Sequence, residues 1–210
     1  ADARARGDQR LESQALTNLG IVFMREHDYD RDTQCFDAAL KQAEEVHDLR
    51  ESAIALENLG VLAHLRGDIG EALRRYHAAL AALKTLGNKH MQARAAQNLA
   101  ELHLLLGDVE RAASIIEFIG HLDDGTLPPE VVGEGLLLRA RLSIDEGELH
   151  QASRFLERAR SIYRKVDDEA RLAEVALVSG QLELKRSDIG AARAALDLVG
   201  QLFDVRRAAQ

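Results

Sequence analysis

The chain has 210 residues, of which 46% are apolar and 30% charged, a balance that excludes a disordered or membrane-embedded protein. Its formal net charge of −8 at pH 7 disfavours nucleic-acid binding, because a surface that binds phosphates needs an excess of basic side chains. A single cysteine, Cys35, excludes an intrachain disulfide and suits a reducing, cytoplasmic location. No apolar stretch approaches the ~18–20 residues of a membrane span, so no membrane partner is expected.

A short motif recurs with a period of 40 residues, which indicates a repeat protein. It reads Asn18-Leu19-Gly20, Asn58-Leu59-Gly60 and Asn98-Leu99-Ala100, and the small residue continues at Ala140 and Gly180. A break follows at His27-Asp28, Gly67-Asp68, Gly107-Asp108, Gly147-Glu148 and Ser187-Asp188. After the break lies a mostly small column at Asp32, Ala72, Ala112, Ala152 and Ala192. A large apolar column comes next, at Phe36, Tyr76, Ile116, Leu156 and Leu196.

Each copy of the motif predicts a hairpin of two amphipathic helices. Apolar residues recur with helical spacing on both sides of the break. Glycine in the break supplies a left-handed residue that ends the first helix, and the acidic residue after it caps the second. The five hairpins are predicted at about residues 10–48, 50–88, 90–122, 128–167 and 168–207.

Two places depart from the regular pattern. Asp32 puts a carboxylate in the small column, so it must find a hydrogen-bond partner unless the first hairpin packs loosely. Between the third and fourth hairpins, the helix is predicted to end near Gly120, and His121 to Pro129 are predicted as a loop, with proline opening the next helix. Because the 40-residue register continues through this loop, residues 1–210 are predicted to form one domain. The chain also starts without Met, which suggests a fragment of a larger protein.

These columns resemble the tetratricopeptide repeat (TPR), including a further alanine at Ala39, Ala79 and Ala159. The usual TPR period is ~34 residues. The longer period here resembles the repeats of kinesin light chains, spindle-orientation adaptors and bacterial peptide-sensing or maltose-activator-type regulators. The resemblance covers essentially the whole chain. It implies an all-α fold, a right-handed superhelical solenoid of five TPR helical hairpins, whose first helices line a concave groove.

The resemblance implies a peptide-binding face on the first three hairpins. The main feature is the asparagine ladder of Asn18, Asn58 and Asn98, because a carboxamide pairs with both N–H and C=O groups of an extended peptide. Alternatively, these asparagines bond to neighbouring helices and only fix the repeat geometry. The predicted peptide-binding residues are Gln14, Thr17, Asn18, Ile21, Arg25, Glu57, Asn58, Val61, His64, Arg94, Gln97, Asn98 and Glu101.

The same face becomes apolar in the last two hairpins. The predicted apolar groove consists of Leu137, Leu138, Ile144, Leu177, Val178 and Leu184. It would take an amphipathic helix or hydrophobic side chains; alternatively, it is core beneath a further helix. The last helix carries Leu198, Val199, Leu202 and Phe203, which predicts either further repeats or self-association through this helix.

Catalysis and metal binding are not expected. The eight histidines form no metal-binding motif, and Cys35 has no ligand close in sequence. The Gly-Asp pairs are explained by the hairpin breaks, so no phosphate loop, cofactor or catalytic residue is predicted. The favoured function is a protein–protein interaction module, the sensor or adaptor part of a larger regulator, that binds an extended peptide or protein segment. The alternatives are an architectural module for self-association or packing on an adjacent domain, and a small-ligand sensor.

Overall fold

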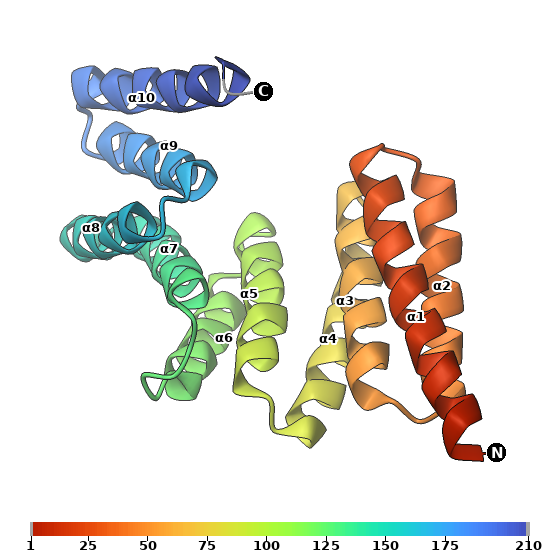
Figure 1. Cartoon of the computed structure of the whole chain (residues 1–210). Helices are drawn as coiled ribbons and strands as arrows, with labels where there is room; N and C mark the ends of the chain where they lie inside the picture. The colour runs from red at the N-terminus through yellow and green to blue at the C-terminus, as the bar shows by residue number, and fades with distance from the viewer. Residues whose placement is uncertain (1, 209–210) are drawn as a thin grey trace. The chain divides into compact units, whose positions relative to one another are not determined.

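The computed structural model describes the backbone of residues 2–208 and the side chains of residues 8–201. Throughout this range the chain consists of helices joined by short connections, without strands, which confirms the all-α hairpin architecture (Figure 1). The chain forms two compact units, residues 1–102 and 103–210. The single domain over residues 1–210 stays a prediction.

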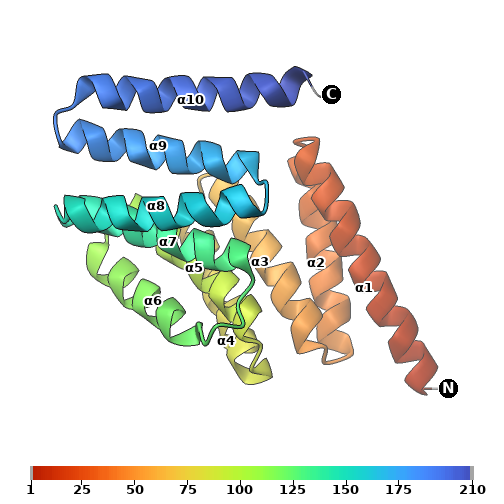
Figure 2. The ribbon, with the colours of Figure 1, turned by 60° about the vertical axis from the view of Figure 1, so that its left-hand side comes forward.

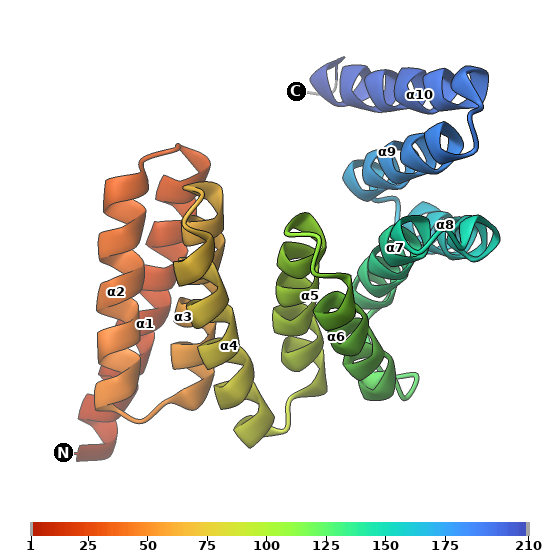
Figure 3. The same cartoon turned by 180° about the vertical axis from the view of Figure 1, so that it is seen from behind.

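The first unit contains the first two hairpins and the beginning of a third. Its helices are α1 (Asp2–Arg25), α2 (Tyr29–Glu45), α3 (Leu49–Leu65), α4 (Ile69–Leu86) and most of α5 (Lys89–Leu105). Helix α1 packs on α2 and α3, and α3 packs on both α2 and α4 (Figure 3). Gly60 of the Asn-Leu-Gly motif allows α3 and α4 to approach closely, because a methyl group there would lie 2.6 Å from the Tyr76 ring.

The second unit continues the repeat. Its helices are α6 (Val109–Leu122), α7 (Pro129–Asp145), α8 (Leu149–Lys165), α9 (Glu169–Lys185) and α10 (Ile189–Ala208). Helices α7 to α10 form successive antiparallel layers (Figure 2). The core between α7, α8 and α9 is apolar; its largest members are Leu136, Leu137, Leu156, Tyr163, Val178 and Leu182.

The hairpin turns confirm the predicted break. Gly67, Gly107 and Gly147 adopt positive φ, where glycine avoids the clash of a Cβ atom. His27 and Ser187 take the same conformation in the first and last hairpins. The following acidic residue accepts a backbone N–H at the start of the second helix in four hairpins, at Asp28, Asp68, Asp108 and Asp188. Glu148, in the fourth hairpin, makes no such bond.

Asp32 is fully buried in the small column and is only partly satisfied. Its Oδ1 accepts a bond from the Thr33 hydroxyl at 3.3 Å and lies 4.0 Å from the Arg66 guanidinium. Its Oδ2 has no hydrogen-bond partner among the described residues. Burial raises the pKa of Asp32, while bonds from Thr33 and the charge of Arg66 oppose that rise.

Candidate functional site

The first helices of the first unit expose a narrow stripe of side chains. On α3, Asn58, Val61 and His64 are partly exposed. On α5, Arg94 is exposed and Asn98 is partly exposed. The neighbouring positions Thr17, Glu57 and Gln97 are buried, with exposed fractions of 5 to 6%. The structure therefore divides the predicted peptide-binding residues into an accessible set and a set inside the helix packing.

The asparagine ladder does not present three equivalent carboxamides. Asn18 is exposed and makes no hydrogen bond to any described residue. The Asn58 Nδ2 donates to the Ile54 carbonyl of its own helix at 3.0 Å. The Asn98 Nδ2 donates to the Glu57 carboxylate at 3.4 Å. Two of the three amide donors are thus engaged within the protein, and only Asn98 bonds to a neighbouring helix, which leaves the carboxamide oxygens of Asn58 and Asn98 to accept bonds.

Glu57 organises the contact between α3 and α5. Its Oε1 accepts bonds from Arg94 at 2.9 Å and from Asn98. Burial raises the pKa of Glu57, whereas Arg94 and Asn98 lower it by stabilising the carboxylate. Glu57 therefore positions the accessible Arg94 and Asn98 and does not itself reach solvent.

The remaining predicted residues of the first unit have mixed surroundings. The Gln14 Nε2 donates to Glu51 at 2.9 Å, so its side chain links α1 to α3. Ile21 packs against the apolar cluster around Phe36. Arg25 is exposed and Glu101 partly exposed. The accessible part of the predicted face consists of Asn18, Arg25, Asn58, Val61, His64, Arg94, Asn98 and Glu101.

Most of the predicted apolar groove of the second unit is core. Four of its six residues are only 0 to 5% exposed: Leu137, Leu138, Ile144 and Val178. They are core residues, as in the alternative interpretation, and cannot line a groove. Their neighbours on α8 and α9 fill the space around them. Leu177 and Leu184, in contrast, are 43% and 59% exposed.

An apolar cavity of about 450 Å³ lies between α9 and α10. Its walls include Leu177 and Leu184, together with Ile189 and Leu196 of α10. Ile189 and Leu196 are 75% and 55% exposed. Arg141, Glu174 and Arg193 stand at its polar edges. We refer to this cavity as the α9–α10 groove.

Ile189 and Leu196 are surface residues that the sequence pattern does not predict. Leu196 occupies the large apolar column, whose other members Phe36, Tyr76, Ile116 and Leu156 are 0 to 4% exposed. The signal for its exposure lies only in the packing, because no described helix covers this face of α10. Leu202 and Phe203, which the sequence also assigns to an apolar face, have side chains outside the described residues.

The described residues offer no metal centre. They contain no group of three or more His, Cys, Asp or Glu side chains placed to hold a metal ion. None of the helices in this part of the chain combines the length and apolar character that crossing a membrane requires.

Comparisons with known proteins agree with the hairpin geometry. The profile of the tetratricopeptide repeat matches residues 11–85 and 51–117, which together span about half of the chain. No curated protein matches the chain in sequence.

Solved structures share the fold at low sequence identity. BtubC (BKLC) from P. vanneervenii has a TM-score of 0.72 at 18% identity, over 97% of this chain and 90% of that one. PilF of Pseudomonas aeruginosa has a TM-score of 0.67 at 21% identity, over 94% and 78%. The nearly identical TPR-like repeats of a Podosopora anserina protein of the kinesin light chain type give 0.68 at 14% identity, over 93% and 96%. With its repeat columns, hairpin turns and profile match, the chain belongs to the tetratricopeptide repeat family.

Proposed function

We propose that this chain is a non-catalytic interaction module and that its α9–α10 groove binds an amphipathic helix of a partner protein. TPR folds generally serve as protein-interaction scaffolds and not as enzymes. The observation that carries the proposal is a change of burial between residues 40 positions apart. Leu137, Ile144 and Leu156 are 0 to 5% exposed, whereas Leu177, Leu184 and Leu196 are 43 to 59% exposed.

Helix α9 covers the fourth hairpin, and its sequence indicates which kind of partner helix would fit the α9–α10 groove. It covers α7 and α8 with Val175, Val178 and Leu182, which follow one another at i, i+3 and i+7. A helix with the same aliphatic spacing would cover α9 and α10 in the same way. Arg193 at the edge of the groove has no carboxylate partner among the described residues, so an acidic residue beside the aliphatic stripe would complement it.

A peptide with the α9 sequence, residues 169–185, tests the groove directly. We expect the labelled peptide to bind the chain, and Leu184→Asp with Leu196→Asp to weaken binding at least tenfold, because charges would then line the apolar wall. Leu105→Asp with Leu106→Asp is the matched control, since these leucines are 68% and 50% exposed elsewhere in the chain. A peptide with Val175→Asp and Val178→Asp controls for the apolar stripe.

Two outcomes would overturn this assignment. Equal peptide affinity for the groove variant and the control variant would place binding elsewhere. A concentration-dependent mass in sedimentation that is abolished by the groove variant alone would assign the groove to a second copy of the chain, which is the self-association alternative.

A second candidate function uses the first unit. We propose that an extended peptide lies across α1, α3 and α5, because Asn18, the Asn58 carboxamide oxygen and Arg94 remain accessible there. Twelve-residue peptides selected from a displayed random library against the wild-type chain provide the probe. We expect Asn18→Ala with Asn58→Ala to lose several-fold affinity for these peptides, at about 0.5–1.5 kcal/mol for each hydrogen bond. Unchanged affinity in the folded double variant would remove the asparagines from the mechanism.

The cellular setting is a separate proposal. We propose that the chain is cytoplasmic and acts as the sensor or adaptor part of a larger regulator. The support is the 40-residue period, together with the lone buried Cys35, whose pKa is raised by burial so that it stays an unreactive thiol.

A further inference from the structure

Helix α8 is strongly basic in an acidic chain. It carries five basic side chains and one carboxylate, that of Glu157, whereas the chain has 35 acidic and 27 basic residues. Arg154, Arg158, Arg164 and Lys165 are exposed. Among the described residues, none of these four forms an ion pair. We call these four residues the basic face of α8.

The second helix of the second hairpin provides a contrast. On α4, the corresponding second helix of its hairpin, Arg74 and Arg75 both pair with Glu71 at 2.5 Å. On α8, Arg154, Arg158 and Lys165 recur at i, i+4 and i+11, so they lie on one side of the helix over about 16 Å, and Arg164 lies at the border of that side. The mutual repulsion of these side chains is left uncompensated within the protein, which is the electrostatic condition for recruiting an acidic partner.

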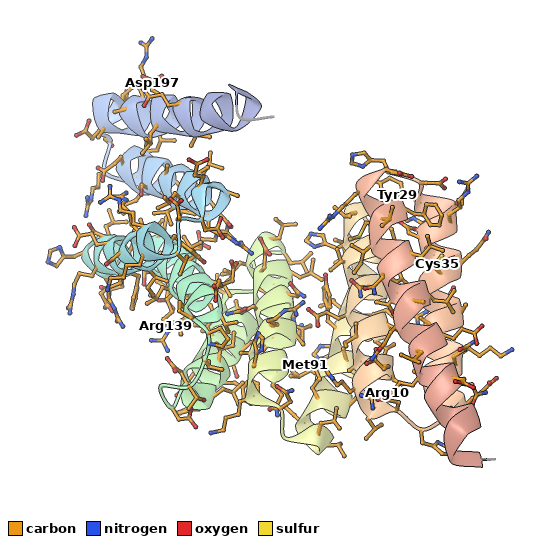
Figure 4. All side chains as sticks on the ribbon, viewed as in Figure 1. Arg10, Tyr29, Cys35, Met91, Arg139 and Asp197 are labelled. Carbon is orange, nitrogen blue, oxygen red and sulfur yellow. The ribbon has the colours of Figure 1, made fainter. Side chains whose placement is uncertain are left out.

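The basic face continues into a cavity of about 150 Å³ between α6, α7 and α8. Arg158 lines its edge, and Arg139 of α7, labelled in Figure 4, contributes a second guanidinium. Arg139 stacks over the Phe155 ring at 5.9 Å and has no carboxylate partner among the described residues. Apolar walls from Ile119 and Leu136 complete the cavity. Such a cavity suits a side chain with a short aliphatic stem and an anionic end.

Gly120 lies against the end of the Arg139 side chain. A methyl group at Gly120 would overlap with the Arg139 guanidinium, so alanine at this position would displace the end of this flexible side chain. Asp123, which also lines the cavity, accepts a bond from the Gly125 backbone at 3.1 Å and forms no ion pair with either arginine. The cavity thus keeps two cations available on one side.

We propose that the basic face of α8 and the Arg139–Arg158 cavity bind an acidic segment of a protein, with one glutamate or aspartate side chain inserted between the two arginines. A protein segment fits better than a nucleic acid for two reasons. The cavity has apolar walls that accept a methylene stem, and the net charge of −8 repels a long polyanion beyond the 16 Å patch. The site is separate from the α9–α10 groove, so it accepts a partner independently of the proposed function.

A labelled deca-glutamate peptide is the probe for this site. We expect it to bind the 210-residue chain at low salt and to lose affinity steeply between 50 and 300 mM salt, roughly tenfold, as screening weakens the contacts. Arg154→Glu, Arg158→Glu and Arg164→Glu together should abolish binding. The matched control changes Lys41, Arg50 and Lys185 to Glu, which alters the net charge equally at exposed positions that form no ion pair with any described residue.

Single-residue variants test the cavity separately from the face. Gly120→Ala should weaken deca-glutamate binding about threefold by displacing Arg139, whereas Gly200→Ala, where a methyl group meets nothing within 4 Å, should leave it unchanged. Circular dichroism establishes that each variant is folded.

Three results would overturn the proposal. The first is no binding of deca-glutamate at low salt, and the second is equal loss in the triple variant and its charge-matched control. The third is tighter binding of a ten-nucleotide single strand or of phosphatidylserine vesicles than of deca-glutamate, which would assign the face to another class of partner.

Discussion

The fourth and fifth hairpins have nearly the same local structure but different surfaces. In both, two helices join through a turn with a left-handed residue, Gly147 or Ser187. In the fourth hairpin, Leu156 is 3% exposed beneath α9, and in the fifth its counterpart Leu196 is 55% exposed. Burial in this fold is therefore contributed by the neighbouring hairpin as much as by the residue itself. The same side chain is core in one repeat and exposed surface in the next.

The largest expected effect on the free energy of unfolding comes from truncating a core leucine. Leu156→Ala should lower the free energy of unfolding by about 3 kcal/mol, because it leaves a cavity among packed side chains. Leu196→Ala should change it by less than ~0.5 kcal/mol, since this side chain already contacts solvent. Urea denaturation of the two variants provides the measurement. A comparable loss in both would mean that Leu196 is covered in solution.

Replacing a glycine by alanine should change the stability in opposite directions in the two hairpins. Gly133→Ala would place a methyl group 2.6 Å from the Tyr163 ring, so we expect destabilisation of about 2 kcal/mol. Gly180→Ala meets its nearest atoms at 3.6 Å and should gain about 0.5–1 kcal/mol from helix propensity. Thermal unfolding distinguishes the two, and a stabilising Gly133→Ala would contradict the described contact with Tyr163.

Asp32 extends the comparison to the first hairpin, because its column contains buried alanine in the fourth and fifth, at Ala152 and Ala192. Asp32→Ala should raise the free energy of unfolding at pH 7 by about 1–2 kcal/mol, since it removes a buried and incompletely bonded carboxylate.

The pH dependence of this variant follows from the raised pKa of Asp32. A carboxyl group with a raised pKa binds its proton more readily in the folded state, so its penalty is present at neutral pH and disappears as pH falls below its unfolded value. The advantage of Asp32→Ala should therefore shrink between pH 7 and pH 4. An advantage that grew on acidification would contradict the burial of the charged form.

The smallest expected difference concerns the caps of the second helices. The Asp188 carboxylate accepts the Ala191 N–H at 2.9 Å, so Asp188→Ala should cost about 1 kcal/mol. Glu148 makes no cap bond, and Glu148→Ala should have almost no effect. Chemical denaturation of both variants tests whether the fifth hairpin is as well formed as the fourth, and a silent Asp188→Ala would show that α10 begins elsewhere.

Local features were predictable from the sequence, whereas side-chain availability was not. The positive φ of Gly67 and the cap at Asp68 follow from residue types at a fixed spacing, because both depend on a single turn of chain. The bond from Asn58 to Ile54 was not predictable in this way, since the asparagine can turn either to its own helix or to solvent. Val178 and Leu177 are adjacent in sequence, yet one is buried and the other exposed, a difference that only the packing of α9 on its neighbours decides.

The residues at the hairpin turns affect which hairpins unfold locally most often. His27 and Ser187 adopt a backbone conformation that costs a residue with a Cβ atom about 1 kcal/mol, and glycine relieves this cost in the hairpins between them. Amide hydrogen exchange should accordingly be fastest in the outermost hairpins. A helix that docked on α9 and α10 would then reduce the motion of the last hairpin. Binding of the partner and ordering of this hairpin would therefore occur together.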